Sequence, residues 1–427
     1  MKSAAQTHYI TPDDLRIGYY VQLDLAWMDH PFAFRNFLIK NDEQITKIRK
    51  LNLRQIRYDP SRSTVAPSSN QAIPHEAEFP KTIQIHFTSK ITSPTLSNIQ
   101  QSNRLNQLNN IRLNCTKAFT KNATAAHEAT CILIHHPKRA KEIATNLVDE
   151  MVNSIITESD VALHAISNNA NGNGNSNHAI NVTVLALMLA KSLGISADDA
   201  AMLGIASIFH EIGKTNNLQN KSYLDLHCEA GAKIARNSGL PERVANIIFQ
   251  HLEYSDGSGH PMHIFNDKID ALARILILVN YFDNLCNPEN AEEAMTPYEA
   301  LQYMYAYQAS KFDTSLIKHL IKLIGVYPSG SVVQLSNNAY GIVMAVNADK
   351  PLQPLVMIYS PEVARATPVV INLSEDISLS IKRCLNPNKI PKDAFDYLKP
   401  SKRICYYFHK KEVANTDEMP LENAIAA

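Results

Sequence analysis

Between residues 177 and 325 the sequence is a succession of amphipathic segments, in which apolar side chains recur three or four positions apart. This spacing is typical of helices that bury one face. Residues 196–199 and 296–299 have the order of a capping box, which marks the beginning of a helix. The stretch 271–285 is nearly all apolar and is expected at the centre of the core. Because five or more such helices have to bury their apolar stripes against one another, the sequence predicts an all-α domain.

The first part of the chain has a different pattern, with short apolar runs between polar residues. Residues 19–25 alternate like a strand, and 37–39 and 53–58 are further candidate strands. Residues 42–51 have helical composition, with apolar side chains on one face. A small N-terminal α/β domain is therefore expected over residues 8–63.

A polar stretch follows this domain. Residues 60–110 are rich in Pro, Ser, Asn and Gln, a composition that buries little apolar surface and is typical of a linker. Helical periodicity resumes over residues 138–167, and a low-complexity loop rich in Asn and Gly follows at 168–175. We therefore expect a linker with a helical part over 64–137 and the all-α domain over 138–328.

Beyond the helices the period changes from helical to alternating. Residues 331–336 and 340–346 flank Asn337-Asn338 in the order of a β-hairpin. Two further runs are candidate strands, 355–359 and 369–373. A β-rich C-terminal extension is expected over 329–427, so the expected fold class is multidomain, with a small α/β domain, a central all-α domain and a β-rich extension.

Composition narrows the class of protein. A chain of 427 residues is too long for one compact core. The formal net charge is zero, so nothing in the overall charge indicates a nucleic-acid partner or an anionic membrane. There is no apolar run of about 20 residues, the length a membrane span needs. None of the six cysteines has CxxC spacing, which argues against a zinc knuckle and favours a reduced, cytoplasmic protein.

Two motifs in the helical region carry a family resemblance. His210-Glu211-Ile212-Gly213-Lys214 is followed by His251-Leu252-Glu253-Tyr254-Ser255-Asp256-Gly257-Ser258-Gly259-His260-Pro261. Together they resemble the HD-GYP family of cyclic-di-GMP phosphodiesterases, whose pattern is His-Asp-x-Gly-Lys followed by His-His-Glu-x-x-Asp-Gly-x-Gly-Tyr-Pro. Three positions depart from that pattern: Glu211 replaces the Asp, Leu252 the second His, and His260 the Tyr.

The resemblance continues outside the two motifs. Residues 15–18, 27–32 and 37–39 are similar to the N-terminal domain that precedes many HD-GYP modules. Gly325-Val326-Tyr327-Pro328 and the β-rich sequence after it are similar to a subfamily with a C-terminal β extension. The resemblance thus covers nearly the whole chain outside the linker, and it identifies the all-α region as an HD-GYP helical domain.

A metal site is implied by the resemblance. Four residues match metal ligands of the family: His178, His210, His227 and His251. Glu211 takes the place of the carboxylate that bridges two ions, and Asn280 stands where many HD proteins have a ligating Asp. The implied cofactor is one or two divalent ions, with Fe or Mn expected. Glu211 and Lys214 are the expected catalytic residues, the lysine as a contact for a substrate phosphate. The loop expected to bind substrate or a partner contains Asp256, Gly257, Gly259 and Pro261.

The implied function is cyclic-di-GMP signalling, with hydrolysis of cyclic di-GMP to pGpG and GMP by a weakened site. An alternative is a catalytically inactive regulatory module that binds cyclic di-GMP or a diguanylate cyclase (GGDEF) protein. An HD hydrolase for another nucleotide is a third possibility. A second copy of the chain is a candidate partner, whereas nucleic acid and membrane are not expected.

Structural roles compete with these assignments. A histidine at the end of an apolar helix is commonly a core or capping residue rather than a ligand. Arg236, Arg243 and Arg274 are candidate phosphate contacts, yet helix arginines are more often solvated charges.

Overall fold

The computed structural model describes most of the chain in two compact units. The described residues are 8–23, 36–51, 53–65, 96–158, 161–167, 174–214, 223–347, 350–365, 368–376, 378–401 and 404–410. One unit comprises Met1–Thr95 with Gln302–Gln308, and the other comprises Leu96–Leu301 with Ala309–Ala427. Among the described residues, no helix has the length and apolar character needed to cross a membrane.

The N-terminal unit contains a small antiparallel sheet with a helix, as predicted. Strands β1 (His8–Ile10), β4 (Ile56–Tyr58), β2 (Tyr20–Gln22) and β3 (Asn36–Leu38) are neighbours in that order, and α1 covers Asp42–Arg49. The Asn41 side chain caps α1 by accepting a hydrogen bond from the Gln44 backbone. β1 was not predicted, and the family-like segment 27–32 lies outside the described residues.

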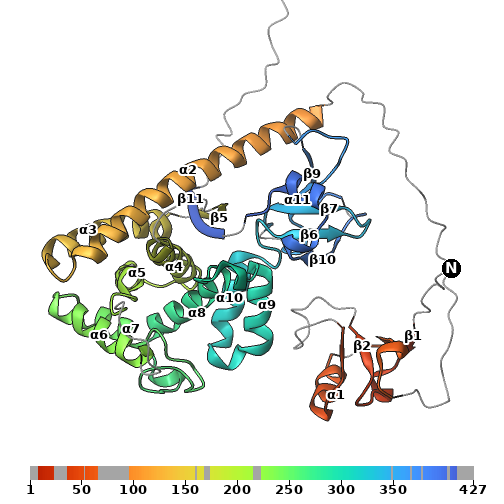
Figure 1. The fold of residues 1–427 in the computed structure, drawn as a ribbon, viewed down its shortest axis with the longest axis horizontal. Helices are drawn as coiled ribbons and strands as arrows, with labels where there is room; N and C mark the ends of the chain where they lie inside the picture. Colours follow the sequence, from red (N-terminus) through yellow and green to blue (C-terminus); the bar gives the residue numbers. More distant parts are fainter. Residues whose placement is uncertain are drawn as a thin grey trace, which may run out of the picture. The chain divides into compact units, whose positions relative to one another are not determined.

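The second unit is built around helices (Figure 1). They are α2 (Leu96–Ile132), α3 (Pro137–Val152), α4 (Gly174–Ser192), α5 (Ala197–Phe209), α6 (Tyr223–Asn237), α7 (Glu242–Gln250), α8 (Ala271–Cys286) and α10 (Thr314–Ile324). Helix α9 (Pro297–Tyr307) begins in this unit, and its residues from Gln302 onward belong to the other unit. Both predicted helix starts are confirmed: Ser196 caps α5 by accepting from the Asp199 backbone, and Thr296 and Glu299 form a complete capping box by bonding each other reciprocally. Short 3₁₀ turns occupy Pro12–Asp14, Pro60–Arg62, Asn266–Lys268, Ala291–Glu293, Ala309–Lys311 and Pro387–Lys389. The predicted all-α domain is confirmed in its helical character.

Helix α2 corrects the prediction that residues 60–110 form a linker, since their last part, from Leu96, is helical. Buried side chains recur along α2 at helical spacing: Cys115, Phe119, Ala123, Ala126 and Ala129. The helix packs against α3 and α4, where small side chains allow close approach. Polar residues on the other faces of α2 give the segment a polar composition overall, so the sequence prediction assigns its first part to a linker.

A two-stranded sheet corrects a second prediction. Residues 138–167 were expected to be helical throughout, but α3 ends in a π-helical turn (Asn153–Thr157) and β5 (Val161–Ser167) follows. β5 pairs antiparallel with β11 (Ile404–Lys410), with Ala165 opposite Tyr406. β11 therefore belongs to the helical part of the unit rather than to the sheet of the C-terminal extension.

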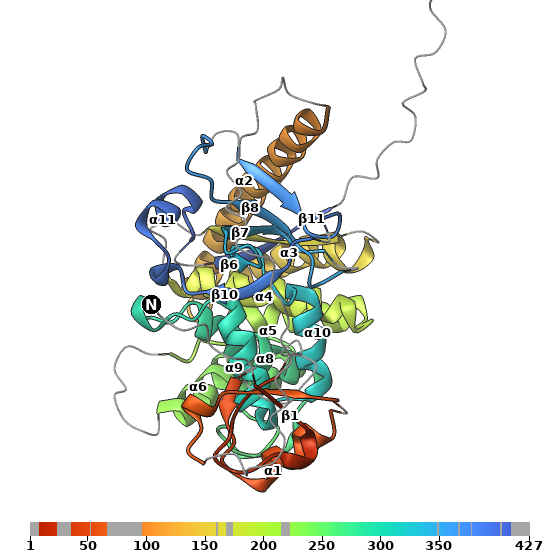
Figure 2. The ribbon, with the colours of Figure 1, turned by 90° about the vertical axis from the view of Figure 1, so that its right-hand side faces the viewer.

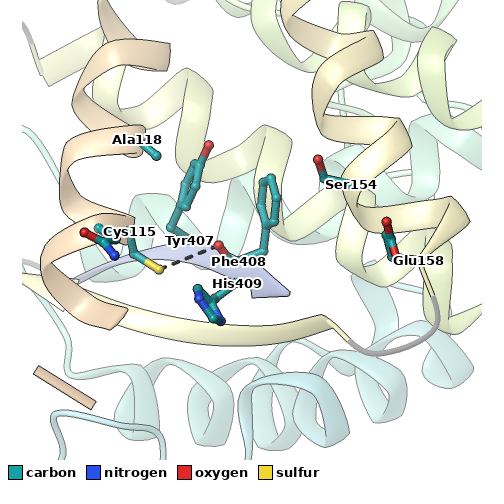
Figure 3. Close-up of a pocket in the computed structure, with 8 residues that line it drawn as sticks. Cys115, Ala118, Ser154, Glu158, Tyr407, Phe408 and His409 are labelled. Atoms are coloured by element: carbon teal, nitrogen blue, oxygen red, sulfur yellow. Dashed lines mark hydrogen bonds between the residues drawn. The ribbon is translucent and has the colours of Figure 1, made fainter. Parts of the chain in front are cut away.

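β11 also packs against α2 beside a cavity of about 230 Å³ (Figure 3). The rings of Tyr407 and Phe408 lie side by side there, with centroids 4.6 Å apart. The Cys115 thiol lies 3.6 Å from the Phe408 carbonyl oxygen, and Asn122 donates to the Tyr407 hydroxyl at 2.7 Å. These contacts hold β11 against α2.

The C-terminal extension is the predicted β-rich element. Its sheet has the order β10 (Ile381–Leu385), β6 (Val332–Leu335), β7 (Tyr340–Ala345), β8 (Leu355–Ile358) and β9 (Val369–Asn372). The first four strands follow one another in this order in Figure 2. The hairpin between β6 and β7 is confirmed, and its turn places Asn338 at φ +67°, a conformation that Asn tolerates. β10 and α11 (Lys392–Leu398) were not predicted.

Candidate metal centre

His210 and Glu211 lie directly after α5, at the centre of the candidate site. His210 is completely buried, and its Nδ1 lies 2.8 Å from the Ser207 carbonyl oxygen. A carbonyl only accepts, so Nδ1 carries the proton and Nε2 presents its lone pair. Gly213 permits this turn to lie against α6, since a Cβ there would sit 2.1 Å from the His227 carbonyl oxygen.

His178 on α4 faces the same point. Its Nε2 lies 3.2 Å from His210 Nε2 and 3.8 Å from Glu211 Oε1. One ligand atom from each of His178, His210 and Glu211 lies within 4.8 Å of the others. Two imidazole nitrogens and a carboxylate oxygen around one point are a donor set suited to a divalent transition metal.

His251 and His227 extend this group. The ring centroids of His210 and His251 are 5.2 Å apart, and those of His251 and His227 are 5.0 Å apart. His251 Nδ1 donates to the Ile248 carbonyl oxygen at 2.6 Å, and its buried Nε2 has no hydrogen-bond partner among the described residues. A buried lone pair without a partner is costly unless a ligand satisfies it, so this atom also fits a metal.

All four predicted histidines thus lie in one row, although the tight donor cluster contains only His178 and His210 of them. His227 is oriented differently, since its Nε2 lies 3.4 Å from the His210 carbonyl oxygen. Ligand roles for His227 and His251 stay predictions.

Burial keeps most of these imidazoles neutral, which is the form that binds metal. It lowers the pKa of His210 to about 4, and it lowers the pKa of His251 well below the ordinary value. Burial also disfavours charge on His178, but the hydrogen bond that His178 donates to Asp283, together with the negative charges of Asp283 and Glu211, outweighs burial and raises the pKa of that imidazole. For Glu211, burial opposes ionisation, yet His210, His178 and Lys214 together hold the pKa of the carboxyl well below its usual range.

Lys214 lies beside the carboxylate rather than apart from it. Its Nζ contacts Glu211 Oε1, and about a third of its side chain is exposed. The lysine therefore places a positive charge at the edge of the donor cluster, where an anionic group would meet it.

Asp283 on α8 is a site residue that sequence reasoning missed. Its Oδ2 lies 2.6 Å from His178 Nδ1, and its carboxylate is 1% exposed. Asn181 and Asn287 donate to Oδ1, the latter at 2.7 Å. Asp283 thus holds the His178 proton on Nδ1 and turns Nε2 to the donor cluster, the arrangement that carboxylates commonly provide behind metal-bound histidines.

Asn280, the α8 residue that stands where many HD proteins have a ligating Asp, lies one turn away from Asp283. It is buried, and its side-chain oxygen accepts from Asn284 at 3.0 Å. The sequence signal that could have identified Asp283 is its position as an acidic residue within a mostly apolar helix, because a buried carboxylate needs a partner.

The predicted substrate loop is held by internal bonds. Glu253 is fully buried and accepts from the backbones of Met262 at 2.6 Å and Ile264 at 3.2 Å. A Cβ on Gly259 would lie 2.2 Å from the Tyr254 nitrogen, so glycine is required there. Asp256 bonds the Ser258 backbone and hydroxyl through one oxygen and Ser310 through the other. These contacts account for the loop's shape, and its binding role stays a prediction.

The three candidate arginines are engaged in ion pairs. Arg236 pairs with Glu242, Arg243 bridges Asp199 and Asp270, and Arg274 pairs with Asp313. The arrangement favours structural roles over phosphate contacts.

A cavity of about 440 Å³ opens beside the donor cluster, and both His178 and Glu211 line it. Small-molecule sites commonly have volumes of roughly 300–1,000 Å³. Together with the neutral imidazoles and Lys214, this space can accept a small ligand that carries an anionic group.

Comparisons with known proteins agree with the three-part organisation. Residues 8–158 match a domain of unknown function (DUF3391), residues 150–316 match the HD domain, and residues 332–393 match the KOW domain associated with HD domain. The matches to the first two families overlap within α3 and the turn after it.

Curated relatives include phosphodiesterases of cyclic dinucleotides. The chain is 22% identical to cyclic di-GMP phosphodiesterase PA4108 of Pseudomonas aeruginosa, over 81% of this chain and 83% of the relative. It is 28% identical to cyclic di-GMP phosphodiesterase response regulator RpfG of Xanthomonas campestris, over 32% of this chain and 39% of the relative. A solved structure, Bd1817, a HDG"Y"P protein from Bdellovibrio bacteriovorus, aligns with a TM-score of 0.39 and 16% identity over 74% of this chain and 98% of that chain.

Proposed function

We propose that this chain, whose central domain is an HD domain of the HD-GYP type, is a metal-dependent phosphodiesterase of cyclic-di-GMP signalling. Its substrate is cyclic di-GMP, hydrolysed to pGpG and GMP. The observation that carries the proposal is the cluster of His178, His210 and Glu211 beside a cavity large enough for a small ligand. Similarity to PA4108 over most of both chains supports the choice of substrate.

The proposed roles follow from the geometry. His178, His210 and Glu211 hold one ion, and His251 and His227 are the residues available for a second. A divalent ion at this place would make water a stronger nucleophile and neutralise phosphate charge. Asp283 keeps the His178 lone pair directed to the cluster, and Lys214 supplies a cationic contact for the phosphate. We propose Fe or Mn as the metal, since imidazole with carboxylate suits both.

An alternative is a regulatory module that binds cyclic di-GMP or a GGDEF protein without turnover. Two observations favour it. Lys214 occupies one oxygen of Glu211. Leu252 offers no ligand atom, and its carbonyl accepts from the His260 backbone at 2.9 Å within the loop.

The test combines metal content with hydrolysis. We expect protein purified without oxygen to contain about one to two Fe or Mn ions per chain and to hydrolyse cyclic di-GMP. His210→Ala should lose both properties, whereas His135→Ala, at an exposed turn, should keep both. Bound metal without hydrolysis would favour the regulatory module.

One restoring double variant separates a weakened enzyme from a module that has lost turnover for other reasons. Glu211→Asp and Leu252→His together return the two altered positions to the HD-GYP pattern. Increased turnover in this double variant would locate the weakness at the ligands. Binding of cyclic di-GMP with no turnover in either protein would contradict the phosphodiesterase proposal.

A further inference from the structure

The cavity beside the donor cluster has two walls from different parts of the sequence. One wall belongs to the HD domain and contains Ser176, His178 and Ala179 of α4, with Ile208, Glu211 and Ile212 at the end of α5. The other wall belongs to α2, which lies before the residues that match the HD domain. α2 packs against α4, and Figure 1 shows it running across the helical domain.

Four residues of α2 form the second wall: Ala126, His127, Thr130 and Cys131. Ala126 is buried, and the Thr130 hydroxyl donates back to its carbonyl at 2.8 Å, so both are engaged by the helix itself. His127 and Cys131 are exposed and one turn apart, with Cys131 Sγ 3.6 Å from His127 Nε2. His127 and Cys131 are therefore the exposed polar residues on this wall.

We propose that α2 completes the nucleotide pocket and that His127 is a specificity-determining residue, whose ring contacts a base of the nucleotide held at His178 and Glu211. The inference rests on the proposed function. A phosphate at the donor cluster leaves the base to extend along the cavity, and a planar imidazole offers it both a stacking face and hydrogen-bonding nitrogens. The pocket of this protein would then combine the HD domain with a helix from outside it.

Cys131 provides a native reporter for this wall. It is the exposed one of the six cysteines, and it lines the same cavity one turn from His127. A ligand in the cavity should shield its thiol from a small alkylating reagent such as iodoacetamide.

The first experiment measures alkylation of Cys131 in metal-loaded full-length protein, with and without saturating cyclic di-GMP, by peptide mass spectrometry. We expect the nucleotide to slow labelling at least roughly tenfold, since a binding pocket buries most of its ligand and excludes reagent. The matched control is Glu128→Cys in a Cys131→Ser background. Glu128 is exposed on the same helix and does not line the cavity, so its labelling should not change.

The second experiment compares His127→Ala with Glu128→Ala. His127→Ala should weaken binding of cyclic di-GMP roughly tenfold, as expected for loss of one base contact to a ring. It should also change the ratio of affinities for cyclic di-GMP and cyclic di-AMP, which a merely structural effect would leave constant. Glu128→Ala should preserve both affinity and ratio, and metal content should be equal in the two variants.

The outcomes distinguish this inference from the proposed function. Binding of cyclic di-GMP to the wild-type protein with unchanged labelling of Cys131, or with a wild-type affinity ratio in His127→Ala, would overturn the α2 wall alone. Failure of the wild-type protein to bind cyclic di-GMP would overturn both.

Discussion

Replacing Asp283 with Asn should weaken metal binding through the tautomer of His178. The Asp283 carboxylate accepts from His178 on one oxygen and from Asn181 and Asn287 on the other. An Asn side chain has one acceptor end and one donor end. Two amide donors favour the acceptor end, so the new NH₂ group should face His178.

The consequence for His178 is a changed proton position. Nδ1 would have to accept from the new amide, which moves the imidazole proton to Nε2, the atom that faces His210 and Glu211. A protonated Nε2 cannot bind a metal. Loss of a partner behind a metal-bound histidine typically costs about 10–100-fold in affinity. At 1.4 kcal/mol per factor of ten, this corresponds to roughly 1.4–2.8 kcal/mol.

The assay is calorimetric titration of metal-stripped protein with Mn²⁺ at pH 7 and pH 8.5. Because Asp283 raises the pKa of His178, protons compete with metal at the lower pH in the wild-type protein. A defect caused by the tautomer should persist at pH 8.5. The matched control is Asp270→Asn, the same substitution at the N-cap of α8, which should leave Mn²⁺ affinity unchanged.

Wild-type affinity in Asp283→Asn at both pH values would refute the reasoning. So would an equal loss in Asp270→Asn, because the effect would then come from α8 as a whole. Unfolding in denaturant should show that Asp283→Asn remains folded, since the substitution preserves volume and the bonds from Asn181 and Asn287.

Three further predictions concern stability. Burial, His409 and Arg112 lower the pKa of His164 to about 4, from the ordinary histidine value of 6.5. Between these two pH values the unfolded chain binds a proton that the folded protein does not, so the free energy of unfolding should decrease as the pH falls through this window. Between pH 7 and pH 5 the wild-type protein should lose up to about 2 kcal/mol more than His164→Gln; parallel curves from urea unfolding would contradict this. Tyr407→Phe should cost about 1–2 kcal/mol because Asn122 loses its partner, and adding Asn122→Leu should recover part of that cost in the same assay. Gly259→Ala should lower the free energy of unfolding by about 3 kcal/mol through backbone overlap. Gly194→Ala, where φ is +70° and the new Cβ meets nothing within 4 Å, should cost only about 1 kcal/mol; equal losses would argue against the overlap.

Local sequence signals predicted the elements that depend on local physics. The capping boxes at Ser196 and Thr296 mark helix starts because their hydrogen bonds span three residues. The apolar stretch 271–285 became α8 at the core, since nearly every face of it is buried. The grouping of His178 with His210 and Glu211 followed from family resemblance, because spacing alone does not bring residues 32 positions apart together.

Elements that depend on distant partners could not be predicted in this way. β5 is a strand because β11 pairs with it, and nothing near residues 161–167 indicates that partner. The buried stripe of α2 consists partly of alanines, whose small side chains hardly change the mean hydropathy of a polar segment. Asp283 acts through His178 rather than as part of a motif, so its role appears only once α4 and α8 are packed. The domain boundaries stay predictions.

The position of β11 determines when this protein can finish folding during synthesis. The Tyr406 backbone donates to Asn181 at 2.6 Å across 225 residues of sequence, and Asn287 donates to the Ile404 carbonyl oxygen. Ribosomes add roughly 5–20 residues per second, so Asn181 waits on the order of 10–45 s for this partner. During that interval Asp283 is held by asparagines whose own bonds are incomplete. A chain released before residue 404 would carry every residue of the donor cluster and still lack the strand that steadies it.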